Sequence, residues 1–336
     1  MSLDIHGLVL TYNRRELVLR CVNALLSQTH PLKSIIVIDN GSSDGTGDAL
    51  RALNSPLIQI VRIEENIGAA RGFAYMLDHG FAKAKVEWGY MMDDDVICEP
   101  TAVEELVKAY ERNFTAPEQV GFFVSQAVDA QGRANNVPHI DTRPRRAGEC
   151  PDWGLYLDQG IVSVRGSPMS AMLMPRTTFE DFGNLNSEFV IWGEDLEYTM
   201  RITEQRPGLI VGRSKMVHLR AQTGDISIFL ENDKKRVPNF YYLYRNQLFV
   251  RRKYMGMHAY ANGIIRFLYD TSKLVAHGDL WKAQIALRGT MAGIVFNPKT
   301  PWPEGKAPAE GNASTPAQVS AEGKVARERK SPAAAE

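Results

Sequence analysis

The first hundred residues alternate between short apolar runs and segments in which apolar residues recur at helical spacing. Residues 35–38 read Ile-Ile-Val-Ile, and β-branched side chains of this kind suit a strand buried on both faces of a parallel sheet. Val18, Cys21, Val22 and Leu25 instead recur every three or four positions, which predicts a helix. The same reasoning predicts strands at residues 7–10, 35–38, 58–63 and 88–92, and helices around residues 18–25, 50–53, 70–77 and 103–110. Repeated strand–helix units predict an α/β fold with a mainly parallel sheet flanked by helices.

The later part of the chain has a less regular pattern. Residues 115–165 are rich in Gly, Pro, Arg and Asn, which predicts loops that pass over a site. Residues 171–174 and 209–218 predict two further strands, and residues 239–295 are mostly helical in pattern. The last segment, residues 303–336, contains no Leu, Ile, Phe, Tyr or Trp, so it is predicted to be a disordered tail.

Polar clusters follow three of the predicted strands directly. They occupy residues 11–14, 39–44 and 93–95. Ligands of open α/β sheets bind beyond the carboxyl ends of the strands. We therefore expect these three clusters to meet at one edge of the sheet and to form a binding site there.

Composition narrows the class of protein. The 336 residues include 39 Lys and Arg and 39 Asp and Glu, and 44% of them are hydrophobic. Disorder of the whole chain is therefore excluded, and the absence of a basic excess argues against a nucleic-acid binder. Three features favour a cytoplasmic protein. The three cysteines are widely spaced, the N-terminus is unlike a secretory signal, and no stretch of about 18 consecutive apolar residues occurs.

The triplet Asp93-Asp94-Asp95 is the strongest candidate for chemistry. Three carboxylates after a buried strand repel one another unless a cation lies among them. In an extended stretch the first and third side chains point the same way, so Asp93 and Asp95 would face the ion. Oxygen ligands of this kind suit Mg2+ or Mn2+. The alternative is a solvated acidic turn.

Two further segments suggest contacts to a nucleotide. Asp39 and Asp44 lie in a dense turn, where a carboxylate can bind a nucleobase or ribose, or can simply cap a helix. Asn66 begins a stretch rich in small residues that leads to Arg71, which can contact a phosphate, although a glycine-rich helix entry explains the same pattern. No GxGxxG follows the first strand, which disfavours a nicotinamide-dinucleotide fold.

A second acidic cluster extends from Trp192 to Glu197. Asp195 is a candidate general base for a hydroxyl, and the Trp192 ring offers a face on which a sugar can stack. The alternative is a helix N-terminus with favourable negative charge. His218 ends a predicted strand and is a candidate metal ligand, although a lone histidine there is more often structural.

The C-terminal third combines basic and apolar residues. Basic side chains between Lys234 and Lys253 lie in an aromatic-rich stretch and can contact phosphates, anionic lipid or solvent. Farther along, Ile264, Ile265 and Leu268 fall on one side of a predicted helix. Contact with a membrane surface, contact with a second copy of the chain and ordinary core packing all explain this pattern.

These residues, in this order, resemble glycosyltransferase family 2, whose members are inverting enzymes of the GT-A fold. The resemblance rests on VLTYNR, VIDNGSSDGT, ENIGAARG and MMDDDV in the first half, and on FVIWGEDLEYTMR, MVHL and NFYYLYRNQLF in the second. The second set looks like bacterial galactofuranosyltransferases and related rhamnosyltransferases, although this chain has Trp-Gly-Glu-Asp where the former usually have Trp-Asp-Asp.

The resemblance implies roles for particular residues, and it implies a Rossmann-like GT-A fold. The implied roles are nucleoside binding for Thr11 and Asp39, diphosphate binding for Asn66 and Arg71 with Asp94 also on the donor side, metal binding for Asp93, Asp95 and His218, general base for Asp195, and acceptor binding for Trp192 and Glu194. It also implies a catalytic domain at residues 1–235, with a nucleotide-sugar half at about 1–110 and an acceptor half at 111–235, and a helical region at 236–302.

The sequence thus predicts an inverting glycosyltransferase that depends on Mn2+ or Mg2+. The expected donor is UDP-galactofuranose first and dTDP-rhamnose second, and the expected acceptor is a cell-wall or lipid-linked glycan. Peripheral attachment to the inner face of the plasma membrane and homo-oligomer formation both stay open. A sugar nucleotidyltransferase and a sugar-nucleotide-binding module without transferase activity are the alternatives.

Overall fold

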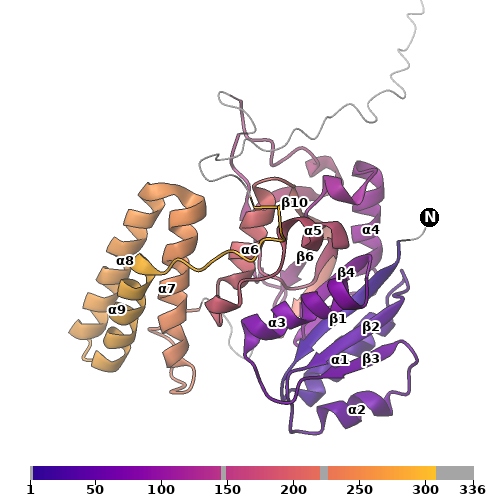
Figure 1. The fold of residues 1–336 in the computed structure, drawn as a ribbon, viewed down its shortest axis with the longest axis horizontal. Coiled ribbons are helices and arrows are strands. Elements are labelled where there is room, and N and C mark those ends of the chain that lie inside the picture. The colour runs from indigo at the N-terminus through magenta and orange to yellow at the C-terminus, as the bar shows by residue number, and fades with distance from the viewer. Residues whose placement is uncertain (1–2, 145–148, 220–225, 308–336) are drawn as a thin grey trace, which may run out of the picture.

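The computed structural model describes residues 3–144, 149–219 and 226–307. In these ranges a sheet flanked by helices carries a helical segment to one side (Figure 1). The strands are β1 (Ile5–Thr11), β2 (Ser34–Asp39), β3 (Ile58–Arg62), β4 (Trp88–Asp93), β5 (Val96–Cys98), β6 (Phe122–Val128), β7 (His139–Ile140), β8 (Ile161–Gly166), β9 (Met172–Pro175) and β10 (Gly208–His218). The α-helices are α1 (Arg15–Leu26), α2 (Thr46–Ala52), α3 (Ala69–Leu77), α4 (Ala102–Asn113), α5 (Arg176–Phe182), α6 (Glu194–Thr203), α7 (Phe240–Val250), α8 (Gly256–Ala276) and α9 (Leu280–Val295).

The sheet is mainly parallel, as predicted. Its order is β3-β2-β1-β4-β9-β6-β10-β8-β7, and β5 also pairs with β10. Strands β3, β2, β1 and β4 are parallel neighbours. Strand β9 runs antiparallel to both β4 and β6, and β10 is parallel to β6. The direction of β1 to β4 therefore continues in β6 and β10, with β9 inserted between the two groups.

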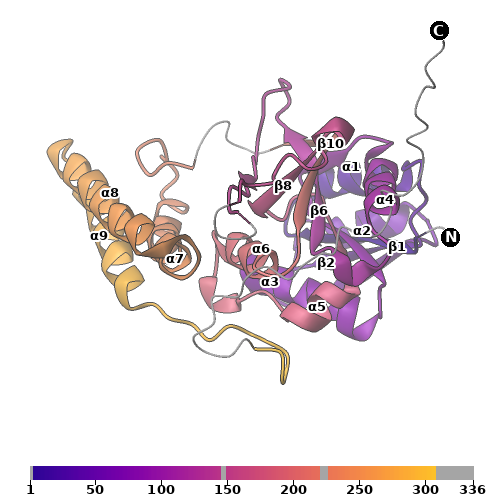
Figure 2. The ribbon, with the colours of Figure 1, turned by 90° about the horizontal axis from the view of Figure 1, so that it is seen from above.

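Two hydrophobic cores cover the two faces of the sheet. Side chains alternate across each strand, so that Val9 and Val37 belong to one core and Leu8 and Ile36 to the other. Helices α1 and α4 close the first core, whereas α3, α5 and α6 close the second (Figure 2). The predicted strands and helices of the first 113 residues are all present.

The prediction of irregular loops in residues 115–165 is only partly correct, because the segment contains strands as well as loops. Strand β6 lies inside this segment and is among the most buried strands, because Phe122 and Phe123 contribute to opposite cores. Strand β8 also begins there, at Ile161. Gly, Pro, Arg and Asn residues dominate the average composition of this segment. The composition therefore predicts loops, although two short apolar runs within the segment form strands.

The C-terminal helices form a unit with a core of its own, which confirms the helical pattern predicted for residues 239–295. Phe240, Tyr244 and Leu248 on α7 pack with Phe267 on α8 and Ala286 on α9. The domain boundaries predicted from the resemblance, at about residue 110 and at residues 235 and 302, stay predictions. Most of the predicted disordered tail, residues 308–336, lies outside the described residues.

Candidate active site

The parallel strands bring their polar ends together at one edge of the sheet. In the pairing register, Thr11 at the end of β1 lies opposite Asp39 at the end of β2, and Leu10 lies opposite Asp93 at the end of β4. The polar turns that follow these strands therefore start side by side, although they are separated by up to about eighty residues in the chain.

Two of the three aspartates at the end of β4 share one basic partner. The Thr11 hydroxyl donates a hydrogen bond of 2.7 Å to Asp94 Oδ2. Arg14 Nη1 lies 3.1 Å from Asp94 Oδ1 and 2.9 Å from Asp95 Oδ2, so a single guanidinium links two of the carboxylates. Sequence reasoning placed Arg14 in a polar turn but gave it no role. Its position in the turn directly after the first parallel strand could have indicated a role at this edge of the sheet.

His218 reaches the same cluster from the end of β10. In the antiparallel pairing of β10 with β5, His218 lies opposite Val96, directly after the aspartates. Its Nε2 is 3.0 Å from Asp95 Oδ1, and both side chains are buried. Within the described ranges, the buried Nδ1 of His218 has no hydrogen-bond partner.

Burial and neighbouring charges shift the pKa values of Asp93 and Asp95 in opposite directions. It raises the pKa of Asp93 well above the usual range, and the charges of Asp95 and Asp94 raise it further. Burial acts on Asp95 in the same sense, but the hydrogen bond and charge of His218 and the charge of Arg14 outweigh it and lower the pKa of Asp95. Asp93 is thus the carboxyl whose negative charge the protein compensates least.

The donor set fits a hard divalent cation in its chemistry. Asp93, Asp95 and His218 offer carboxylate oxygens and an imidazole, and the crowded charge at Asp93 is of the kind that a cation relieves. In the described part of the chain, however, no three His, Cys, Asp or Glu side chains already stand close enough to hold a metal ion. An arriving cation would therefore have to compete with the Asp95–His218 and Asp95–Arg14 contacts.

The turn before α6 has an unusual backbone. Val190, Trp192 and Gly193 have φ values of 70°, 60° and 107°, and the first two are residues that rarely adopt positive φ. The side-chain amide of the fully buried Asn246 on α7 donates to the carbonyls of Phe189, Ile191 and Trp192, at 2.9, 3.1 and 2.8 Å. One helix of the C-terminal unit therefore holds the turn in place.

This turn delivers Glu194 and Asp195 to the first turn of α6. Burial raises the pKa of Glu194 to about 8, with a further contribution from the charge of Asp195. Burial also raises the pKa of Asp195, although hydrogen bonds from backbone amides partly oppose the shift. Glu194 is buried and Asp195 is half-buried, and adjacent carboxyls in such a poorly solvated site disfavour two negative charges.

Replacing Glu194 by Gln is expected to remove a pH-dependent loss of stability. A carboxyl whose pKa is higher in the folded than in the unfolded state destabilises the fold increasingly as pH rises toward the folded pKa, here about 8. Between pH 6 and 9 the wild type should lose about 2–3 kcal/mol of unfolding free energy that Glu194→Gln retains, from 1.36 kcal/mol per pKa unit. Urea unfolding at both pH values measures this difference. Glu111→Gln, a change at an exposed carboxyl on α4, is the control, and equal pH dependence in all three proteins would contradict the assignment.

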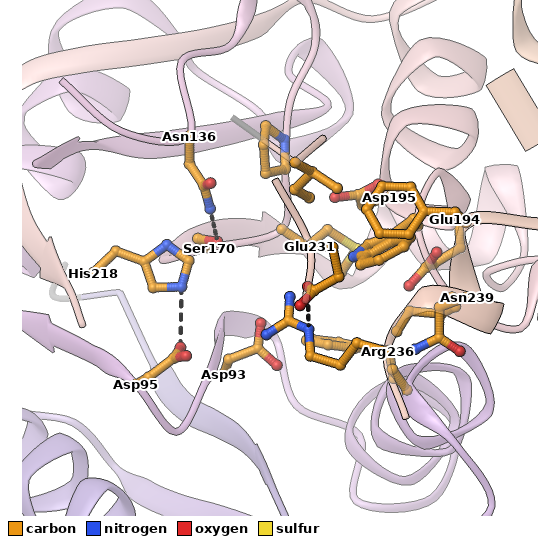
Figure 3. A pocket seen from close by; sticks show the side chains of 18 of the residues that line it. Asp93, Asp95, Asn136, Ser170, Glu194, Asp195, His218, Glu231, Arg236 and Asn239 are labelled. Atoms are coloured by element: carbon orange, nitrogen blue, oxygen red, sulfur yellow. Dashed lines mark hydrogen bonds and ion pairs between the residues drawn. The ribbon is translucent and has the colours of Figure 1, made fainter. Parts of the chain in front are cut away.

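A pocket of about 840 Å³ joins these groups. Asp93, Asp95 and His218 lie on one side of it, and Glu194 and Asp195 lie on the other (Figure 3). The wall between them includes the Trp192 ring, the hydrogen-bonded pair Asn136 and Ser170, and Arg236, whose Nε is 3.0 Å from Glu231. Arg14 also lines it. The pocket therefore combines acidic groups, two guanidinium groups and an aromatic face.

The residues expected to bind the donor lie beside this pocket rather than in its wall. Asp39 accepts hydrogen bonds from the Ser42 amide at 2.8 Å and from Arg62 at 3.0 Å. Asn66 accepts from the Gly68 amide at 2.8 Å. Arg71 is exposed on α3. Thr11 and Asp94 bond to each other at the edge of the sheet, so the lining carboxylates of the triplet are Asp93 and Asp95.

Comparison with known proteins finds similarity to one family in the first part of the chain. Residues 8–152 match the family model described as Glycosyl transferase family 2. An uncharacterized glycosyltransferase of Nostoc sp. is 23% identical over 176 residues, which cover 52% of this chain and 49% of the relative. A succinoglycan biosynthesis protein of Rhizobium meliloti is 23% identical over 131 residues, covering 39% of this chain and 36% of the relative. This chain thus spans about half or less of the length of these curated relatives.

A solved structure shares the fold. The crystal structure of GalNAc-T7 with UDP, GalNAc and Mn2+ superposes with a TM-score of 0.53 at 15% identity, over 74% of this chain and 50% of that protein. The expectation of a GT-A fold is confirmed by this likeness.

Proposed function

From the match of residues 8–152 to the family model described as Glycosyl transferase family 2, we propose that the protein is an inverting glycosyltransferase. It would move a sugar from a nucleotide-diphosphate donor to a hydroxyl of a cell-wall or lipid-linked glycan. UDP-galactofuranose is the first candidate donor and dTDP-rhamnose the second, because the motifs around residues 189–201 and 239–249 resemble those of enzymes that use these sugars.

One observation carries this proposal. A single pocket places Asp93, Asp95 and His218 opposite the adjacent carboxyls Glu194 and Asp195. Displacement of a nucleotide diphosphate by a hydroxyl needs compensation for the charge of the leaving group and a base for the attacking one. The two sides of the pocket offer these two functions, at opposite ends of a space large enough for a sugar.

Each wall of the pocket has its own task in this scheme. Asp195 takes the proton of the acceptor hydroxyl, which attacks the anomeric carbon from the face opposite the diphosphate. Arg14 and Arg236 donate hydrogen bonds to phosphate oxygens, and the Trp192 ring supports the acceptor sugar beside Glu194. Thr11 and Asp39 hold the nucleoside, with Asp94 orienting Thr11 and with Asn66 and Arg71 near the diphosphate.

A divalent cation, Mn2+ or Mg2+, held by Asp93, Asp95 and His218, would supply positive charge to the leaving diphosphate. Removal of divalent cations with EDTA is accordingly expected to lower transfer at least about 10²-fold, because the pocket would then hold the diphosphate charge with its guanidinium groups alone. Added Mn2+ should restore the rate. Transfer of radiolabelled sugar measures both effects, and full activity in EDTA would contradict metal dependence.

Calorimetry with UDP-galactofuranose and dTDP-rhamnose tests the proposed activity against simple binding. Binding accompanied by release of UDP or TDP supports a transferase. Binding without nucleotide release, whatever glycan acceptor is added, would instead indicate a sugar-nucleotide-binding module. Formation of the sugar nucleotide from nucleoside triphosphate and sugar phosphate would indicate a nucleotidyltransferase.

A further inference from the structure

Helices α8 and α9 present large apolar side chains on their outer faces. They carry ten of the large hydrophobic residues that are exposed in the described part of the chain, five on each helix. Val295 is 78% exposed, and Met257 and Ile265 are each 66% exposed. Both views place these helices at the end of the molecule farthest from the sheet (Figures 1 and 2).

The amphipathic pattern of α9 is the reverse of that in an ordinary surface helix. Small residues, among them Gly289 and Gly293, are buried against α7, where an added Cβ would lie 2.6 Å from the Tyr241 carbonyl oxygen and 2.9 Å from that of Arg245. Leu287 and Met291 instead point outward. Soluble proteins bury the large apolar side of a helix, whereas helices in contact with lipid pack through small residues and expose large ones.

Helix α8 repeats this arrangement in part. Met257, Ile265, Leu268 and Val275 recur at helical spacing on its exposed side, opposite the buried Phe267. Large apolar side chains therefore recur over several turns on the outward faces of both helices, with exposed polar residues such as Gln284 and Arg288 among them on α9. We call the exposed apolar residues of these two helices the apolar face: Met257, Ile265, Leu268, Tyr269, Val275, Leu280, Trp281, Leu287, Met291 and Val295.

Positive charge accompanies the apolar face. Residues 240–295 contain eight Arg and Lys and only two Asp, although the whole chain has zero net charge. Arg266, Lys273 and Arg288 are exposed on the same helices. Trp281 and Tyr269, which are also exposed, are side chains that favour the boundary between lipid and water.

We propose that the apolar face docks on the surface of a bilayer that contains anionic phospholipid. Aliphatic side chains would enter the headgroup region, while the neighbouring Arg and Lys would meet lipid phosphates. The described helices include none long and apolar enough to cross a bilayer, so the contact would lie along the surface. A second copy of the chain is a poorer occupant, because pairing this face with itself would bring like charges together.

Docking in this way would place the pocket near the membrane. Phe240, at the start of α7, lines the pocket, and α7 packs against α9. A lipid-linked acceptor would then approach from the side of the membrane. The docking itself does not depend on the proposed transfer reaction, because its test measures binding and not activity.

Vesicle flotation of the full chain tests the proposal. Binding to vesicles of phosphatidylcholine with phosphatidylglycerol should be at least about tenfold stronger than binding to phosphatidylcholine alone. Leu287→Gln combined with Met291→Gln should weaken it about tenfold or more. The matched control is Leu155→Gln combined with Leu157→Gln, which changes two comparably exposed leucines elsewhere and should leave binding unchanged.

Three results would overturn the proposal. The wild type could stay unbound with both kinds of vesicle, or the control could lose as much binding as the α9 variant. The third is a dimer in sedimentation that the α9 variant dissociates, without vesicle binding, which would assign the apolar face to a second copy. Circular dichroism establishes beforehand that both double variants are folded.

Discussion

Asp195→Asn is expected to lower sugar transfer by about 10³-fold and to leave donor affinity within about twofold of the wild type. Asp195 lies in the first turn of α6, and its Oδ1 accepts a hydrogen bond of 2.7 Å from the Leu196 amide. Asparagine has the same shape and keeps an acceptor oxygen, but it cannot take a proton from a hydroxyl. The variant therefore separates the proposed base from the donor side of the pocket.

Two measurements on the same protein decide this prediction. Single-turnover transfer reports the chemical step, and calorimetry with UDP-galactofuranose, or with UDP if the sugar donor proves wrong, reports donor binding. Glu188→Gln is the control, because it changes an exposed carboxyl close to Asp195 in the chain. Turnover of Asp195→Asn at the wild-type rate would remove Asp195 as the base and leave Glu194 as the candidate.

Asn246→Ala is expected to lower the turnover number by about 10²-fold with a small change in KM. It should also cost about 3 kcal/mol of stability. The amide of Asn246 supports three carbonyls of a turn with positive φ values, and that turn carries Glu194 and Asp195. Without it, the carbonyls of Ile191 and Trp192 lose this donor and the turn can relax, whereas the Phe189 carbonyl keeps the Ile191 amide and Arg245. Asn246 does not line the pocket, so we expect it to act as a positioning residue through this turn.

The neighbouring residue supplies a matched control for this change. Gln247→Ala alters a partly exposed amide on the same helix and should change neither parameter greatly. Activity is measured at a temperature where circular dichroism shows Asn246→Ala to be fully folded. Wild-type turnover of the folded variant would show that Asn246 contributes only to stability.

Local patterns predicted the sheet edge well. Parallel strands that end in polar turns must bring those turns together, so the proximity of Thr11, Asp39 and Asp93 follows from strand order. Side-chain alternation likewise places Asp93 and Asp95 in the pocket wall, while Asp94 bonds to Thr11. These inferences succeed because they need only the backbone geometry of a strand.

Contacts between distant segments were beyond such reasoning. The proposed role of Asn246 depends on the docking of α7 against a turn more than fifty residues earlier. An asparagine in an aromatic-rich helical segment was the hint in the sequence. Strand β6 was missed because its apolar run is short. For Asp39 the sequence allowed a nucleoside contact or a turn contact. The structure shows the carboxylate bonded to the Ser42 amide within the turn and to Arg62, and the nucleoside contact stays a prediction.

Net charge also failed to show how charged residues are distributed over the molecule. A net charge of zero discouraged a nucleic-acid partner, but it averages over acidic clusters in the pocket and the excess of Arg and Lys in residues 240–295. The acidic clusters lie in the pocket proposed to bind the diphosphate and the acceptor hydroxyl. The Arg and Lys residues accompany the helices proposed to contact anionic lipid.

Nucleotide release from a panel of sugar nucleotides is the decisive measurement for sugar transfer, because hydrolysis by water reveals donor use even before the acceptor is known. The panel contains UDP-galactofuranose, dTDP-rhamnose and other UDP- and dTDP-sugars, with Mn2+ or Mg2+ present. We predict UDP release from UDP-galactofuranose, or failing that TDP release from dTDP-rhamnose, that EDTA suppresses. Absence of release from every donor by the folded protein, with glycan and lipid-linked acceptors also supplied, would contradict the assignment of this pocket to sugar transfer.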